Sequence, residues 1–398
     1  MDFLKIIVSS LLLGFVTLVH SQTDDEKIVI QDFYLERAIR EHFDKPTGEL
    51  TKLDLELLTR FVVAGQGVTS LKGLEYAKNL TSLRLDNNNI SDLEPLAGLT
   101  KLKNLVINGN KIESLHAIEN LVDLETLLFD RNLLTDIGPL SKLNKLRSIS
   151  GNFNKIKRID VAKNWTELTH FNLAFNELES IEPLKELTKL KGIWIPDNHV
   201  TNIEAVMELK ALEILILEKN PISDIKAMSG LNQLIQVNLM DTKVKDFSPL
   251  SNLKNIGVLV LRNNNIGDLG FLKNLTNIEW LDLRENKIES IEVLKNLNKL
   301  KKLFLSGNRI KSIVPLARME QLRWVLLAHN QIDNLWPLYS LRSLTDLSFH
   351  NNRLKSSESL VAMNSKIIKK LDTEGKYVAA ANKKVNSIYS LEPSRKLQ

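Results

Sequence analysis

The sequence predicts an α/β solenoid, a horseshoe of about 14 short coils with a parallel sheet on its concave side and a helical N-terminal cap. Three observations predict it: an apolar spacing that recurs with a constant period, a strand-like alternation inside each period, and a helical stretch before the first one. The chain has 25% charged and 43% hydrophobic residues, which is typical of a folded protein. It contains no cysteine, which excludes disulfide scaffolds, cysteine-ligated zinc and thiol catalysis.

The repeat has the pattern LxxLxLxxNxI, and its first full unit runs from Leu80 to Ile90. A degenerate unit precedes it at residues 58–68. The Asn position then recurs with a constant step at Asn88, Asn110, Asn132, Asn154, Asn176, Asn198, Asn220, Thr242, Asn264, Asn286, Asn308, Asn330 and Asn352. Such an unbroken series is the signature of a leucine-rich repeat solenoid.

The spacing inside one unit has a physical cause. Leu83 and Leu85 lie two residues apart, so both point to the inner face of a short strand. The Asn that follows turns inward, where its amide can bind backbone groups that would otherwise be buried without partners. We therefore expect Thr242 to weaken one rung of this ladder. We also expect Gly151, at an inward Leu position, to leave a void.

The second half of each unit, as at residues 91–96, returns along the convex side, with Ser or Asp placed to cap a helical turn and Pro near its start. Residues 22–57 are predicted to form the N-terminal cap. Within it, residues 32–43 have helical periodicity, and residues 51–58 form a second short helix with Thr51 as N-cap. The repeats are predicted to extend over residues 58–365.

The two ends of the chain carry further signals. Residues 1–21 are predicted to be a secretory signal peptide with Gln22 as the mature start, which places the protein outside the cell without a transmembrane anchor; an uncleaved anchor is the alternative. Residues 366–398, a basic C-terminal cap or tail, hold eight Lys and Arg against three acidic residues, an excess equal to the whole net charge of +5. The repeat body is therefore neutral, which argues against nucleic-acid binding, while the tail could contact anionic surfaces weakly.

The 22-residue unit NxIxDLxPLxxLxxLxxLxLx, together with the cap DFYLERAIREHFDKPTGELTKLDLELL, resembles the internalin-type leucine-rich repeat proteins over residues 28–360. The resemblance implies an exported protein that binds a protein ligand or receptor on its concave face through exposed aromatic side chains. Units such as the one at residues 286–297 also resemble the leucine-rich repeat regulatory subunit of protein phosphatase-1. A phosphatase-regulatory protein is therefore the alternative, if residues 1–21 are not a signal peptide.

Alternation along each strand predicts which side chains face outward on the concave side. Val and Ile there can be explained by strand preference alone, but three of the five Trp cannot. Arg262 and Arg284 border Trp280, and these charges either join the binding surface or pair with their acidic neighbours. The predicted partner-binding residues are Trp194, Ile214, Ile216, Val258, Val260, Arg262, Trp280, Arg284, Phe304, Trp324 and Leu326.

Catalytic and cofactor motifs are missing from the sequence. It holds no Gly-rich phosphate loop, HExxH, EF-hand loop or GxSxG, and of its histidines only His329 and His350, in consecutive units, are expected to approach each other. We therefore predict no enzyme activity, no cofactor and no metal site. Four Asn-x-Ser/Thr sequons are candidate glycosylation sites, although Asn-Leu-Thr also arises from the repeat consensus: Asn79, Asn89, Asn164 and Asn274.

These observations together predict a secreted leucine-rich repeat protein that binds a protein partner on its concave face. Adhesion, host–microbe interaction and innate recognition are the roles that such a surface suits.

Overall fold

The computed structural model describes residues 26–354, which fall into two compact units that meet in the sequence between Leu124 and Glu125. The predicted signal peptide at 1–21 and the predicted basic tail at 366–398 lie outside the described residues.

The first unit opens with the helical cap. Strands β1 (Lys27–Ile28) and β2 (Leu50–Thr51) pair antiparallel, and helices α2 (Phe33–His42) and α3 (Lys52–Glu56) follow them as the sequence predicts. Thr51 caps α3 through a reciprocal capping box with Asp54. The coils of this unit are built from parallel strands β3 (Arg60–Val62), β4 (Ser82–Arg84) and β5 (Asn104–Val106) and 3-10 helices η1 (Leu74–Tyr76), η2 (Glu94–Leu96) and η3 (His116–Ile118).

Asp32 joins the cap to the first coil. One carboxylate oxygen accepts hydrogen bonds of 3.0 Å from the backbone N–H groups of Tyr34 and Leu35, which caps α2. The other oxygen accepts from the backbone N–H of Thr69 at 2.7 Å and from its hydroxyl at 2.8 Å. Burial opposes ionisation, but these hydrogen bonds outweigh it and hold the pKa of Asp32 below its ordinary value.

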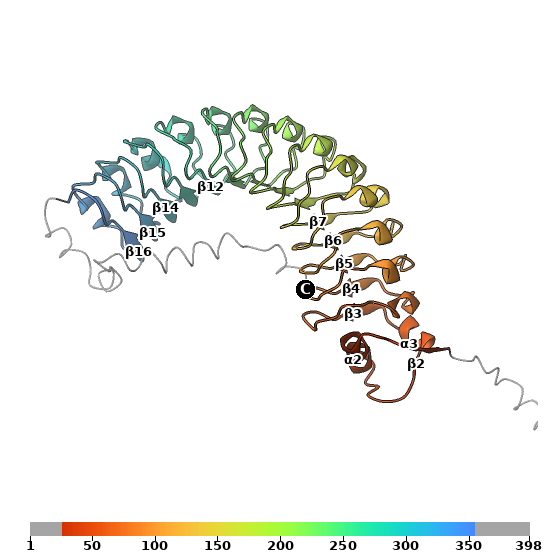
Figure 1. Cartoon of the computed structure of the whole chain (residues 1–398). Helices are drawn as coiled ribbons and strands as arrows, with labels where there is room; N and C mark the ends of the chain where they lie inside the picture. The colour runs from red at the N-terminus through yellow and green to blue at the C-terminus, as the bar shows by residue number, and fades with distance from the viewer. Residues whose placement is uncertain (1–25, 355–398) are drawn as a thin grey trace, which may run out of the picture. The chain divides into compact units, whose positions relative to one another are not determined.

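The second unit contains eleven strands, and with the three of the first unit the described residues give fourteen, one for each predicted coil. In the pairs of the second unit each strand lies parallel to the next, with partners one repeat period apart. These strands line the inner side of the bend that this unit describes in Figure 1. They are β6 (Thr126–Leu128), β7 (Ser148–Ser150), β8 (His170–Asn172), β9 (Gly192–Trp194), β10 (Ile214–Ile216), β11 (Gln236–Asn238), β12 (Val258–Val260), β13 (Trp280–Asp282), β14 (Lys302–Phe304), β15 (Trp324–Leu326) and β16 (Asp346–Ser348).

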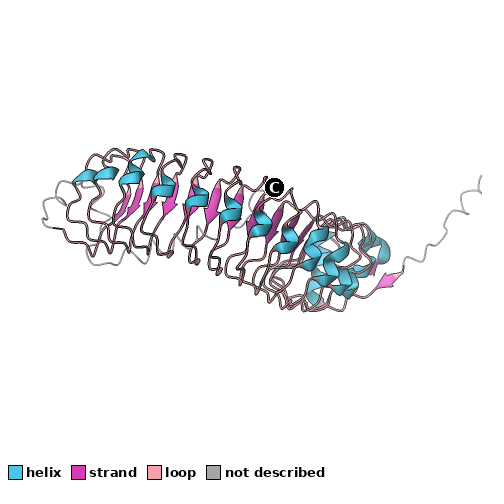
Figure 2. Ribbon diagram, turned by 90° about the horizontal axis from the view of Figure 1, so that it is seen from above, coloured by secondary structure: helices cyan, strands magenta, loops and turns pink. Residues whose placement is uncertain are grey.

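The return segments form one short 3-10 helix per coil, and Figure 2 shows them as a row apart from the strands of this unit. The predicted Ser or Asp accepts a hydrogen bond from the backbone N–H two residues on, as Asp224 does from Lys226 at 2.8 Å. The helices are η4 (Gly138–Lys142), η5 (Asp160–Asn164), η6 (Glu182–Leu184), η7 (Glu204–Val206), η8 (Lys226–Met228), η9 (Ser248–Leu250), η10 (Gly270–Leu272), η11 (Glu292–Asn296), η12 (Val314–Leu316) and η13 (Trp336–Leu338).

The repeated Asn ties successive coils together, as predicted. The side-chain amide of Asn286 donates to the carbonyls of Leu261 and Leu283, both at 3.0 Å, and its oxygen accepts from the N–H of Ile266 at 2.9 Å. The hydroxyl of Thr242, at the equivalent place, lies 2.7 Å from Oδ1 of Asn264 in the next coil and 3.2 Å from the carbonyl of Leu239 in its own coil. Because a hydroxyl carries one proton, it can donate to only one of these acceptors, so this rung makes fewer bonds than an Asn rung.

The void expected at Gly151 is filled, so that expectation was wrong. A Cβ atom placed on Gly151 would lie 2.1 Å from the ring of Phe129 and 2.9 Å from Leu173. Phe129 occupies an inward position in the preceding coil and is completely buried. The larger ring therefore takes up the volume that the glycine releases, and the interior keeps its packing density.

Candidate partner-binding face

The outward side chains of β6–β16, which we call the strand face, carry the predicted binding residues. Strand register sets these side chains in straight columns that cross the sheet. Trp280, Lys302 and Trp324 are direct partners in β13, β14 and β15, and Asp282, Phe304 and Leu326 form the next column. Adjacent strands lie about 4.8 Å apart, so bulky neighbours in one column must touch.

The predicted residues divide into two classes by exposure. Four of them are buried, which corrects the expectation that all of them face water: Ile216 is 7% exposed, Val260 3%, Arg284 6% and Phe304 0%. The others are half-exposed, and they are Trp194, Ile214, Val258, Arg262, Trp280, Trp324 and Leu326. The accessible part of the face is therefore narrower than the alternation of the strands predicts.

Arg284 is buried by its contact with Asp282. The guanidinium Nε lies 2.9 and 3.1 Å from the two carboxylate oxygens, and one terminal nitrogen lies 2.5 Å from Oδ2. Both side chains are almost fully buried. Pairing among neighbouring charges was the alternative to a binding role, and it occurs here inside the structure rather than in solvent. We therefore assign this pair to the support of the face.

Phe304 lies between these groups and the neighbouring indole. The Arg284 guanidinium stands over its ring at 5.3 Å from the centroid. The ring of Trp280 meets it edge-on, with centroids 6.1 Å apart. Phe304 is thus covered by bulky side chains on and just after the adjacent strand β13, which is the physical reason that an outward side chain is buried.

Trp194 is held in a different way. A Cβ atom on Gly192, two residues earlier in β9, would lie 2.1 Å from the outer ring carbon of Trp194. The indole therefore lies flat across the glycine. Its other contact is His170 on β8, whose ring is stacked on the indole at 6.0 Å and an angle of 16°. Burial and Lys191 lower the pKa of His170, against a smaller opposing effect of Glu213.

Lys302 is a functional candidate that was not among the predicted binding residues. Its ammonium lies 4.7 Å from the ring centroid of Trp280 and 5.0 Å from that of Trp324. We call these three residues the Trp–Lys–Trp cluster. The sequence signal that could have found it is the spacing of Trp280, Lys302 and Trp324 by one repeat period each, which dictates that they are neighbours.

A carboxyl group sits between the two indole sites. Glu218 follows β10 and accepts a hydrogen bond from the side-chain amide of Asn238 on β11. Burial raises the pKa of Glu218, although this hydrogen bond and Lys219 act in the opposite direction.

Exposed aromatic residues also lie off the strand face. Trp336 and Tyr339, in and next to η13, are 54% and 59% exposed, and their rings lie 5.6 Å apart. At the loop edge, the rings of Phe153 and Phe175 are stacked at 4.3 Å with backbone φ angles of 56° and 53°. These residues provide comparison sites for any test of the strand face.

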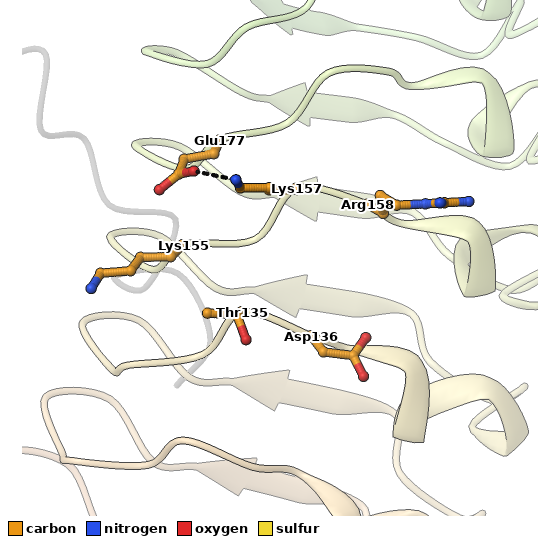
Figure 3. A pocket seen from close by; sticks show the side chains of 6 residues that line it. All are labelled: Thr135, Asp136, Lys155, Lys157, Arg158 and Glu177. Carbon is orange, nitrogen blue, oxygen red and sulfur yellow. Dashed lines mark ion pairs between the residues drawn. The ribbon is translucent and has the colours of Figure 1, made fainter.

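Among the described residues, the side chains that catalysis would need do not come together in one pocket. A hollow of about 340 Å³ beside η5 is lined by Thr135, Asp136, Lys155, Lys157, Arg158 and Glu177. In Figure 3, Lys157 pairs with Glu177 at 3.3 Å, while Arg158 and Lys155 point in opposite directions. Within residues 26–354 no group of three or more His, Asp or Glu side chains could hold a metal ion. In the same range no helix is long and apolar enough to cross a membrane.

The sequons differ in access. Asn89 and Asn274 are exposed. The side-chain amide of Asn79 instead donates to the backbone carbonyl of Glu56 at the end of α3 at 2.8 Å, and that of Asn164 donates to the carbonyl of Ser141 in the preceding coil at 2.9 Å. Because the Nδ2 atoms of Asn79 and Asn164 are engaged in these bonds, the exposed Asn89 and Asn274 are the more accessible candidates for modification.

Comparisons with known proteins agree with this architecture. The family model "Leucine Rich repeats (2 copies)" matches residues 78–120 and 276–318. Among solved structures, the internalin InlF of Listeria monocytogenes is 31% identical, with a TM-score of 0.78 over 80% of this chain and 96% of that chain. The chain belongs to the internalin family. The internalin resemblance predicted from the repeat and the cap is confirmed.

More distant structures share the fold of this internalin-family chain. A leucine-rich repeat protein of Leptospira interrogans is 23% identical, with a TM-score of 0.69 over 77% of this chain and 87% of that one. The ectodomain of the Arabidopsis thaliana receptor kinase GASSHO1/SCHENGEN3, solved with CASPARIAN STRIP INTEGRITY FACTOR 2, is 22% identical, with a TM-score of 0.63 over 73% and 38%. No curated protein matched the chain. Solenoids of this type typically present an extended binding surface and have no catalytic centre.

Proposed function

We propose that this internalin-family protein is exported and binds another protein through the strand face of its second unit. The observation that carries the proposal is the set of half-exposed indoles, Trp194, Trp280 and Trp324, on an otherwise regular sheet. Tryptophan combines a large apolar area with a polar N–H, and it is enriched among residues that dominate binding energy. Adhesion to host surfaces and innate recognition are the roles that fit this proposal.

Two further facts support the proposal. Membership of the internalin family makes export and partner binding the expected properties, and residues 1–21 have the composition of a signal peptide. The ectodomain of the receptor kinase GASSHO1/SCHENGEN3, which has the same fold, was solved in complex with CASPARIAN STRIP INTEGRITY FACTOR 2. The buried Asp282–Arg284 pair and the buried Phe304 in contact with Trp280 would keep the surface around that indole rigid, which lowers the entropic cost of binding.

The test compares partner capture by three versions of the secreted protein. The native protein, a Trp194→Ala/Trp280→Ala/Trp324→Ala variant and a Trp336→Ala/Tyr339→Ala variant are immobilised and exposed to solubilised surface proteins. We expect one partner to be retained by the native protein and by the Trp336/Tyr339 control, and to be lost by the strand-face variant. Circular dichroism establishes that all three fold.

Two outcomes would contradict the proposal. Equal retention of the partner by all three proteins would show that the strand face is not the binding site. Loss of the partner by the Trp336/Tyr339 control alone would place the binding site at η13. Export is tested separately, by N-terminal sequencing of protein recovered from the medium. A first residue of Gln22 is expected, and retention of residues 1–21 in a cell-associated protein would contradict export.

A further inference from the structure

The charge of Lys302 sets it apart from the other lysines near the sheet. Lys301, the preceding residue, pairs with Glu279 at 2.8 Å, and Lys191 pairs with Glu213 at 3.4 Å. Both of these pairs lie at the edge of the sheet and link consecutive coils. Lys302, on the strand face itself, forms no ion pair with any residue in the range 26–354.

The acidic residues of the neighbouring strands on the strand face are already engaged. Asp282, one strand away, is bound by the guanidinium of Arg284. Asp346 lies beyond Trp324, two strands from Lys302, and accepts a hydrogen bond of 2.7 Å from the hydroxyl of Thr345. The half-buried ammonium of Lys302 is therefore stabilised by the two indole faces and carries a charge that no described carboxylate balances.

We propose that the Trp–Lys–Trp cluster binds an Asp or Glu side chain of the protein partner, with apolar side chains of that partner packed on Trp280 and Trp324. The inference rests on the proposed function and specifies the chemistry of its ligand. A carboxylate that reaches Lys302 forms a charge-assisted hydrogen bond in a site from which the indoles displace water. The half-exposed Leu326, two residues after Trp324 in β15, adds to the apolar surface next to Lys302.

The geometry favours a protein carboxylate over a polyanion. Binding to nucleic acid or to an anionic membrane depends on several cations that act together. Here one ammonium stands between two apolar rings, and the next cation in the adjacent strand, Arg284, is already paired with Asp282. An acidic residue flanked by aromatic or aliphatic residues matches this arrangement of one charge and two apolar surfaces.

A library of displayed random dodecapeptides is selected for binding to the immobilised full-length secreted protein. Native protein, Lys302→Met and Lys302→Glu serve as baits, and Lys301→Met is the matched control because its lysine is adjacent but paired at the edge. Native protein and the control should enrich Asp or Glu next to aromatic or aliphatic residues. Selected peptides should bind Lys302→Met about tenfold or more weakly. Lys302→Glu should enrich Lys or Arg at the same place.

A Trp280→Ala/Trp324→Ala variant separates this inference from the proposed function. If selected peptides lose affinity for that variant but bind Lys302→Met unchanged, the strand face stands as the binding site and the carboxylate assignment falls. If they bind both variants unchanged, both proposals fail. Recovery of no peptide by native protein would overturn the carboxylate site. Binding of the native protein to phosphatidylserine vesicles that is abolished by Lys302→Met would also overturn the carboxylate site, because the ligand would then be a lipid surface.

Discussion

The two indole sites of the strand face use neighbouring columns of the sheet in different ways, because Trp194 is the third residue of β9, whereas Trp280 and Trp324 are the first residues of β13 and β15. Trp194 lies flat across Gly192 and stacks on the ring of His170. Trp280 and Trp324 stand on either side of Lys302, which separates their rings. The first site is thus a continuous apolar platform, and the second is a cation held between two apolar walls.

The difference teaches that the neighbour of an indole, rather than the indole itself, determines what the site offers a partner. A glycine lets the ring fold onto the strand, and a lysine in the adjacent strand holds two rings apart and adds a charge. A regular solenoid can therefore place chemically distinct sites a few coils apart by changing a few outward residues at each site.

The largest expected effect on stability comes from the buried Asp282–Arg284 pair, which supports the site formed by Trp280, Lys302 and Trp324. Replacing Asp282 by Ala leaves Arg284 buried without its carboxylate, which should lower the free energy of unfolding by roughly 3–5 kcal/mol. Denaturant titration followed by circular dichroism measures the change. Asp346→Ala, a half-exposed carboxylate on the same face, is the control and should cost less than about 0.5 kcal/mol. Equal effects of the two substitutions would show that the buried pair does not support the site.

A smaller effect is expected from Lys302 itself. Lys302→Ala removes two cation–π contacts, each worth about 0.5–1 kcal/mol, so the free energy of unfolding should fall by about 1–2 kcal/mol. Fluorine NMR of 5-fluorotryptophan-labelled protein should show the Trp280 and Trp324 signals moving while that of Trp194 stays in place. Lys302→Arg, which keeps the charge, should preserve most of the stability. A shift of all three signals would mean that the two sites are not independent.

The interior of the coils was predictable from the sequence because one spacing fixes both register and direction. The alternation around Leu83 and Leu85 and the Asn that recurs once per period give the strand positions and the buried ladder directly, and Asn286 binds its neighbours as expected. The void predicted at Gly151 was wrong because the prediction considered this residue without the side chains of the adjacent coils. The compensating ring of Phe129 lies in the preceding coil, and only pairs of positions one period apart reveal such filling.

The strand face was less predictable because alternation gives the direction of a side chain and not its exposure. Phe304 points outward yet is fully buried, since the side chains around it are themselves bulky. Contacts across a column depend on side-chain conformations, which the repeat pattern does not specify. The same limit explains why Lys302 was not among the predicted binding residues, although the repeat period alone makes it a neighbour of Trp280 and Trp324.

The Gly192 platform can be tested without removing any aromatic residue. Gly192→Ala places a methyl group where the Trp194 ring lies, so the indole must swing outward and leave His170. The free energy of unfolding should change by no more than about 1 kcal/mol, because the displaced atoms are the end of a flexible side chain. The fluorine signal of Trp194 should shift. Gly257→Ala, whose added methyl would meet only a carbonyl oxygen at 3.8 Å, should leave it unchanged.

The smallest expected effect is the pH response of the same platform. Burial, followed by Lys191, lowers the pKa of His170, so in the folded protein the imidazole should titrate below its ordinary midpoint of about 6.5. Because the unfolded chain then binds the proton more readily, this contribution to stability is fully present above pH about 6.5 and is lost as the pH falls from there through the lower midpoint of the folded protein. An NMR titration of the His170 ring should show the low midpoint, and Gly192→Ala should move it upward by exposing the ring. The Trp194 fluorine signal should follow this titration while those of Trp280 and Trp324 do not. A midpoint at or above the ordinary value would show that the stack on Trp194 does not shield His170 from water.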